Sequence, residues 1–214
     1  MNVVFDLGMV LIEWDPRHLY RKVFDDPEKM EWFLATVCHP EWNMEQDRGR
    51  SFAEAVIEAK TRHPDFAAEI EAFHLRWHEM VPGAIAGSVD ILETLHKKGV
   101  PLYAITNWNG DKFRETKLRF PFLNLFKDIV VSGDEGLIKP GQEIFQVLLK
   151  RNGLEAELCV FIDDSLKNVK GAEAVGMKAI HFTSPEKLKA ALKSMEVLQN
   201  RARSPDFSTQ RTKT

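Results

Sequence analysis

The sequence predicts an α/β protein in which a parallel sheet carries helices on both faces and a small all-helical subdomain lies beside it. Short, continuous apolar runs at residues 3–5, 102–106 and 159–162 alternate with longer stretches of helical periodicity, as expected for parallel strands buried on both faces. Between residues 15 and 82 no such run occurs, and helical stretches follow one another. Right-handed crossovers between parallel strands return over one face or the other, so helices should cover both.

These patterns divide the chain into three parts. The α/β core comprises residues 1–14 and 83–199, and the helical subdomain comprises residues 15–82. Residues 200–214 are polar and aperiodic, so we expect a disordered tail there.

Composition and charge limit the partners of the chain. With 214 residues, 44% of them hydrophobic and 29% charged, it is long enough for one sizeable core and a smaller subdomain. The net charge of -3, with both signs mixed along the sequence, offers no basic surface for nucleic acid and no basic amphipathic arm for a membrane. We therefore expect a small-molecule substrate, and a monomer or small homo-oligomer.

The sequence also favours a cytoplasmic location. Cys38 and Cys159 lie far apart in different contexts, which indicates two free thiols and a reducing compartment. The first predicted strand starts at residue 2, which leaves no room for a signal peptide. No apolar run approaches the roughly 18 residues that a membrane span needs.

The first strand, at residues 2–5, ends abruptly at Asp6, and Gly8 keeps the backbone beyond it open. Functional side chains of open α/β sheets sit just past the carboxyl ends of strands, so Asp6 is either a catalytic residue or merely the cap of a loop. Asp15 and Pro16 then suit the start of a helix that leaves the sheet.

The helical subdomain contains two helices with strong internal evidence. Ser51 and Glu54 form a capping box at the start of a helix over residues 51–63. Large apolar residues recur at helical spacing over residues 65–80. We interpret the subdomain as a lid over Asp6.

From residue 82 onward, helices alternate with strands. The expected helices lie at about 85–98, 112–119, 141–153, 165–176 and 188–198, and the expected strands at 102–106, 129–131, 159–162 and 179–182.

Polar residues follow these strands where each one ends. Thr106 and Asn107 follow the second strand, Lys139 lies in the loop after the third, and Asp163 and Asp164 follow the fourth. Because the carboxyl ends of parallel strands meet at one edge of a sheet, these groups should join Asp6 in a single crevice.

Three carboxylates in one crevice repel one another unless a cation joins them. Oxygen ligands suit a hard ion, and Mg²⁺ commonly pairs with one or two carboxylates and a substrate phosphate. A phosphoryl group would then be neutralised by Mg²⁺, the Lys139 ammonium and hydrogen bonds from Thr106, while Asp6 attacks as the nucleophile. Each residue alone has a structural explanation, but their joint occurrence at successive strand ends favours this chemistry.

The pattern resembles the haloacid dehalogenase-like superfamily, most closely its phosphatase branch with a helical cap inserted after the first motif. The four motifs of that family resemble, in order, FDLGMVL with Asp6, ITN with Thr106, IKP with Lys139, and FIDDSLKNVKGA with Asp163 and Asp164. Their order and spacing cover the chain from residue 2 to about residue 182.

The resemblance implies a Rossmann-like core, a mobile cap and an aspartyl-phosphate intermediate. It also implies that Mg²⁺ is held by Asp6, the main-chain carbonyl of Gly8 and Asp164. Asp163 would either bind the ion directly or support the residues that do. Asn168 matches a position that supports the metal cluster.

Gly8 departs from the family pattern. Most phosphatases of this family have a second aspartate there, which protonates the leaving alcohol and then activates water. General acid–base help is typically worth about 10²–10⁴-fold, so its absence needs an explanation.

Three interpretations follow. We favour a sugar-1-phosphate phosphatase, because the sugar leaves as a hemiacetal alkoxide, which is less basic than an ordinary alkoxide and needs less help from an acid. A subgroup of the family that reads DLGNV at the first motif looks similar and includes such phosphatases. A 2-haloacid dehalogenase needs no acid, but then the paired aspartates have no task. If the chain is instead a non-catalytic binding or regulatory protein, none of the polar residues of the crevice has a task.

The sequence does not identify the residue that moves the missing proton or sets the substrate. Polar and aromatic candidates lie near the predicted junction between cap and core: Glu13, Asp15, Arg17, His18, Trp42, Gln46 and Arg48.

Overall fold

The computed structural model describes residues 1–198. The predicted disordered tail at 200–214 lies outside the described residues. In the described part both cysteines are free and buried. None of its helices combines the length and the apolar character that crossing a membrane requires.

The described residues form a parallel five-stranded sheet in the order β3-β2-β1-β4-β5, which confirms the predicted fold class. The strands are β1 (Asn2–Phe5), β2 (Leu102–Thr106), β3 (Asp128–Val131), β4 (Cys159–Asp163) and β5 (Lys178–His181). In the centre, Val4 of β1 pairs with Tyr103 on one side and Phe161 on the other. Asp6 therefore begins where the most central strand ends.

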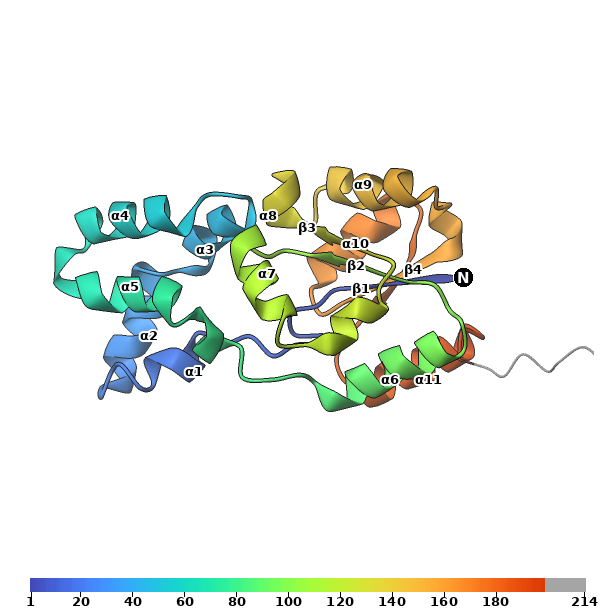
Figure 1. The fold of residues 1–214 in the computed structure, drawn as a ribbon, viewed down its shortest axis with the longest axis horizontal. Helices are drawn as coiled ribbons and strands as arrows, with labels where there is room; N and C mark the ends of the chain where they lie inside the picture. Colours follow the sequence, from blue (N-terminus) through green and yellow to red (C-terminus); the bar gives the residue numbers. More distant parts are fainter. Residues whose placement is uncertain (199–214) are drawn as a thin grey trace, which may run out of the picture.

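Successive residues of β1 contribute to opposite faces of the sheet. Val3 and Phe5 join a core that includes side chains of α6 (Ala86–Lys97) and α11 (Pro185–Ser194), whereas Val4 joins a second core with α9 (Gln142–Asn152) and α10 (Leu166–Ala174). Figure 1 shows α9 on one side of the sheet and α6 and α11 on the other. This alternation is the pleat of a strand, and it buries Val3, Val4 and Phe5.

Residues 15–82 contain helices and turns and none of the strands of the sheet, and α1 to α5 gather at one end of the molecule (Figure 1). Their bounds are α1 (Arg17–Tyr20), α2 (Pro27–Thr36), α3 (Pro40–Asp47), α4 (Phe52–Arg62) and α5 (Ala67–Leu75), with 3₁₀ helices at Pro64–Phe66 and Trp77–Met80. Proline begins α2 and α3, where its missing N–H costs nothing. The capping box of Ser51 and Glu54 is confirmed at the start of α4.

The remaining helices connect the strands. They are α7 (Gly110–Lys117), α8 (Ser132–Glu135) and two 3₁₀ helices, Pro121–Leu125 and Ala156–Leu158.

Two predicted helices are shorter than the periodicity indicates. The stretch at 65–80 breaks at Arg76, whose φ of -112° and ψ of 24° are not helical, so Trp77 starts a separate 3₁₀ turn. The last helix ends at Ser194, because Glu196 takes a left-handed φ of 61°. Leu198 still packs into the core, which is why the apolar spacing continues beyond the helix end.

Candidate active site

The carboxyl ends of the central strands bring three aspartates together. Asp6 follows β1, and Asp163 and Asp164 lie at the end of β4 and just beyond it. One carboxylate oxygen from each lies within 4.8 Å of the others. The structure therefore brings the three predicted carboxylates together at this edge of the sheet.

Lys139 lies between two of these carboxylates. Its Nζ is 2.9 Å from Oδ1 of Asp6 and 2.7 Å from Oδ2 of Asp163, and it also donates to the carbonyl of Ile105 at 3.0 Å. Only 2% of the residue is exposed. The place of Lys139 in a loop after a strand suggests a side chain outside the core. That expectation is wrong, because both carboxylates draw the Lys139 ammonium inward.

Asn107 fixes the main chain of Lys139. Its Oδ1 accepts a hydrogen bond from the Lys139 N–H at 2.9 Å, and its Nδ2 donates to the Lys139 carbonyl at 3.1 Å. The side-chain amide is thus used to position the lysine.

Asp163 is held by neighbours at both of its oxygens. Oδ1 accepts from the Ser165 N–H at 2.8 Å and from Asn168 Nδ2 at 3.0 Å, while Oδ2 accepts from Lys139 and from the same Asn168 amide at 3.1 Å. Asp164, by contrast, is exposed. The donors around Asp163 suit a residue that orients the site, and they leave Asp6 and Asp164 as the more available carboxylates.

The buried charges shift one another's protonation. Burial raises the pKa of Asp6 to about 7; the Lys139 ammonium works against this shift, and the Asp163 carboxylate adds to it. Burial disfavours the charged form of Lys139, but Asp6 and Asp163 outweigh it and raise the pKa of the lysine. Burial and the adjacent Asp163 also raise the pKa of Asp164. One lysine thus neutralises only part of the charge of three carboxylates.

A hard divalent cation is compatible with this set of residues. The facing groups are oxygens, they lie close enough to share one ion, and their excess negative charge is relieved by it. Asp6 and Asp164, with the Gly8 carbonyl, are the residues that would hold Mg²⁺, and Asp163 would orient the site from behind.

The charge excess makes the stability of the metal-free protein depend on pH. A carboxyl whose pKa is raised in the folded state stabilises that state fully below its unfolded pKa, near 3.8, and the contribution is lost as the pH rises through about 7. We therefore expect the Tm in EDTA to fall between pH 5 and pH 8, and Mg²⁺ to raise it more at pH 8. Scanning calorimetry at both pH values measures this difference.

The Asp6→Asn variant is the control for this measurement, because it removes one titrating group and should make the decline shallower. Asp47 and Asp164, whose pKa values burial also raises, contribute to the decline in both proteins. His74 has a pKa lowered by burial and acts in the opposite direction, and it is present in both proteins. A Tm in EDTA that rises steadily to pH 8 would contradict the charge arrangement described above.

Thr106, at the end of β2, carries a buried hydroxyl. Among the described residues its Oγ1 has no hydrogen-bond partner, although the residue is only 1% exposed. A buried hydroxyl without a partner is costly, so a ligand that accepts its hydrogen bond is a direct explanation.

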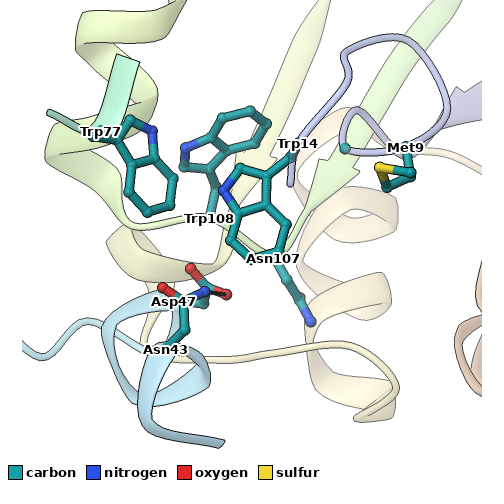
Figure 2. A pocket seen from close by; sticks show the side chains of 8 residues that line it. Met9, Trp14, Asn43, Asp47, Trp77, Asn107 and Trp108 are labelled. Carbon is teal, nitrogen blue, oxygen red and sulfur yellow. Dashed lines mark hydrogen bonds between the residues drawn. The ribbon is translucent and has the colours of Figure 1, made fainter. Parts of the chain in front are cut away.

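A cavity of about 200 Å³ opens beside this edge, between the core and the helical segment. Its lining residues come from both parts of the chain (Figure 2): Gly8, Met9, Trp14, Asn43, Asp47, Trp77, Asn107 and Trp108. Three of them are tryptophans, with ring centroids 6.1 Å apart for Trp14 and Trp77 and 6.5 Å apart for Trp77 and Trp108. The indole nitrogens of all three are buried without a hydrogen-bond partner among the described residues.

None of the seven junction residues that the sequence suggests lines this cavity. Gln46, for example, donates from Nε2 to the Trp42 carbonyl at 2.6 Å inside the helical segment, and Arg17 pairs with Glu31 at the surface. The lining residues of the same region are their neighbours Trp14, Asn43 and Asp47. Asn43 and Asp47 are four apart on α3, and this spacing on one helix face is the signal that could have identified them.

Comparisons with known proteins agree with this architecture. Residues 42–182 match the family model described as haloacid dehalogenase-like hydrolase. The sesquiterpene phosphatase astK of Aspergillus oryzae is 28% identical over 188 residues, which cover 84% of this chain and 88% of that protein. A glyceraldehyde 3-phosphate phosphatase of Pyrococcus abyssi is 32% identical over 99 residues, 46% of this chain, and the match spans only 42% of that protein.

Solved structures share the fold. A magnesium complex of the enzyme bt-2542 from Bacteroides thetaiotaomicron superposes with a TM-score of 0.71 at 20% identity, over 90% of this chain and 98% of that one. A 2-haloacid dehalogenase from Pseudomonas syringae gives a TM-score of 0.60 at 20% identity, over 91% of this chain and 100% of that one. At these identities the likeness establishes the fold alone.

Proposed function

The chain belongs to the haloacid dehalogenase-like hydrolase family, and from this premise we propose that it is a Mg²⁺-dependent hydrolase of small phosphate monoesters. The favoured substrate is a sugar phosphate, with a sugar-1-phosphate first. The reaction passes through an aspartyl-phosphate on Asp6. The proposal rests above all on one observation, the Lys139 ammonium held between the buried carboxylates of Asp6 and Asp163.

The chemistry follows from where the charges lie. A phosphate monoester binds with its anionic oxygens against Lys139 and the Thr106 hydroxyl, which is otherwise without a partner, and against the main-chain N–H of Asn107. An Asp6 oxygen attacks phosphorus in line with the departing ester oxygen. Water then hydrolyses the aspartyl-phosphate and regenerates Asp6.

Magnesium, held by Asp6, the Gly8 carbonyl and Asp164, would supply positive charge that offsets the charge of the phosphate and of the carboxylates. Asp163 and Asn168 keep Lys139 aligned, and Asn107 fixes its main chain. These three residues position the lysine without touching the substrate through their side chains.

The same charges argue against a dehalogenase. A 2-haloacid carries a carboxylate, and a crevice with three aspartates and one lysine repels it when no metal ion is bound, whereas Mg²⁺ would offset the charge of a bound phosphate. Asp163 and Asp164 would have no part in such a reaction, whereas in a phosphatase they balance the cation and the lysine.

The cavity supports a sugar as the leaving group. Indole rings present flat apolar faces that pack against the C–H face of a sugar ring, and their N–H groups can donate to its hydroxyls. The amide oxygen of Asn43 is likewise buried without a partner among the described residues. A cavity with apolar walls and a few polar groups is typical of a small-molecule site.

The proposal is tested by release of inorganic phosphate from p-nitrophenyl phosphate with and without Mg²⁺, alongside halide release from 2-chloropropionate. The phenolate is a good leaving group, so Gly8 should not mask the activity. We expect phosphate release that stops in EDTA and returns with Mg²⁺, and no halide release. A panel of sugar-1-phosphates, sugar-6-phosphates and prenyl phosphates then identifies the leaving group.

Each other outcome is informative. Halide release without metal would establish a dehalogenase. No activity in either assay would favour a binding protein. If prenyl phosphates are hydrolysed in preference to every sugar phosphate, the protein is still a phosphatase, but its leaving group is an isoprenoid alcohol and not a sugar.

A further inference from the structure

Gly8 leaves the proposed phosphatase without a proton donor beside the nucleophile. An alkoxide is a poor leaving group, and a positioned acid typically accelerates its departure by about 10²–10⁴-fold. The donor must reach the cavity in which the leaving group lies. Among the described residues that line this cavity, Asp47 is the one with an acidic side chain.

We propose that Asp47, supplied by α3 of the helical segment, protonates the leaving oxygen and then activates the water that hydrolyses the aspartyl-phosphate. The inference rests on the proposed function and names its missing acid–base residue. Asp47 would thereby take over, from the opposite wall of the cavity, the proton transfer that Gly8 cannot perform because it has no side chain.

Contacts with the core place Asp47 at the cavity. The Ser132 hydroxyl, at the start of α8, donates to the main-chain carbonyl of Asp47 at 2.5 Å. Asn109 Nδ2 donates to the carbonyl of Gln46 at 3.3 Å. Both bonds join the last turn of α3 to the core, so Asp47 depends on the docking of the helical segment for its position.

The carboxylate itself is oriented into the cavity. Nδ2 of Asn43 donates to Oδ2 of Asp47 at 3.2 Å, and Figure 2 shows the carboxylate pointing toward the three indoles. Gly8 and Asn107 line the same cavity on the core side. A leaving group that occupies the cavity therefore lies between the phosphate site and Asp47.

The surroundings let Asp47 hold a proton near neutral pH. Burial raises the pKa of Asp47 to about 7, while the main-chain N–H of Asn109 and the charge of Lys139 work against this shift. A group whose pKa lies close to the working pH is present in both forms, so it can serve as acid in one step and as base in the next.

The two steps balance. In the first, the bond from phosphorus to the ester oxygen breaks as Asp6 attacks, and the proton of Asp47 goes to that oxygen, which leaves as a neutral alcohol. In the second, the Asp47 carboxylate takes a proton from water, the water oxygen bonds to phosphorus, and the bond from phosphorus to the Asp6 oxygen breaks. Inorganic phosphate leaves, and both aspartates return to their starting states.

The test compares the Asp47→Asn variant with the unaltered protein on substrates whose leaving groups differ in basicity. The value of kcat/KM is used because it reports on departure of the leaving group and not on later hydrolysis of the phosphoenzyme. For the most active sugar phosphate of the panel we expect a loss of about 10²-fold or more. For phenyl phosphate the loss should be intermediate, and for p-nitrophenyl phosphate it should be below about fivefold.

Two further variants separate a chemical role from a structural one. Glu45→Gln changes an exposed carboxylate on the same helix and is the matched control. Any change in its kcat/KM should be the same for every leaving group. Gly8→Asp added to Asp47→Asn places a carboxyl on the core side of the cavity, where a Cβ at Gly8 meets no atom within 4 Å. We expect this double variant to regain at least tenfold in kcat/KM for the sugar phosphate.

The outcomes distinguish this inference from the proposed function. If Asp47→Asn loses the same factor on every substrate, or loses nothing, Asp47 is not the acid, although the protein remains a phosphatase. If the unaltered protein releases no phosphate from any substrate, both are wrong. A loss that grows with the basicity of the leaving group and is reversed by Gly8→Asp supports Asp47.

Discussion

The Asp6→Asn variant should lose phosphatase activity by at least about 10⁴-fold, because an amide cannot attack phosphorus and loss of a nucleophile removes the whole covalent route. The fold should survive the change. Oδ1 of an asparagine can still accept the hydrogen bond that the Leu7 N–H donates to Asp6 at 2.7 Å. Phosphate release from p-nitrophenyl phosphate under saturating Mg²⁺ measures the loss, and the Tm shows whether the protein is folded.

A matched control is Asp90→Asn, which makes the same change at an exposed position on α6 and should leave the activity intact. Mass spectrometry of protein quenched in acid during turnover should detect one added phosphoryl group on the unaltered chain and none on Asp6→Asn. Activity retained within tenfold would show that water attacks the substrate directly or that another residue is the nucleophile.

The meeting of the three aspartates is predictable from the sequence for a topological reason. Each short apolar run is typical of a strand buried on both faces, and parallel strands present their carboxyl ends at one edge. Residues placed just after such runs must therefore converge, whatever the details of the helices between them. Asp6, Asp163 and Asp164 follow this rule.

The cavity is not predictable in the same way. Trp14, Trp77 and Trp108 come from three separate segments and meet only where the helical segment docks on the core. Hydrophobic spacing shows which side of a helix is buried but not what it is buried against. Trp77 therefore looks like one more core residue of a long helix, although the helix ends before it and the side chain lines the cavity.

Asp47 illustrates the same limit. Its neighbours Gln46 and Arg48 are equally polar in the sequence, and choosing among them requires the direction of each side chain on α3. That direction follows from which face of α3 packs inside the helical segment, and Trp42 and Gln46 occupy that face. Asn43 and Asp47 are left to face the core.

The burial of Lys139 leads to the second large effect. Removing the lysine leaves Asp6 and Asp163 buried together without their shared cation, and breaking a buried ion pair from one side typically costs about 3–5 kcal/mol. The substrate phosphate also loses its ammonium partner, so we expect Lys139→Ala to lower kcat/KM by about 10³-fold. Weakened phosphate binding and weakened folding should therefore appear together.

The pH dependence of Lys139→Met separates charge from packing, since methionine keeps much of the apolar stem. Without the ammonium, which works against the raised pKa of Asp6, that pKa must rise further in the folded state. The loss of stability should therefore be small at pH 5, where the Asp6 carboxyl can be protonated, and large at pH 8. Mg²⁺ should restore part of the Tm at pH 8 because it supplies the missing positive charge.

Lys112→Met is the matched control, because Lys112 is also buried but pairs with the exposed carboxylate of Glu115 at 3.0 Å. Water can solvate Glu115 once the lysine is gone, so this variant should show neither the pH dependence nor the response to Mg²⁺. If Lys139→Met behaves like Lys112→Met, the lysine contributes through its packing alone. If only Lys139→Met loses stability as the pH rises, the Lys139 ammonium is what allows the buried Asp6 carboxylate to remain charged, which a nucleophilic Asp6 requires.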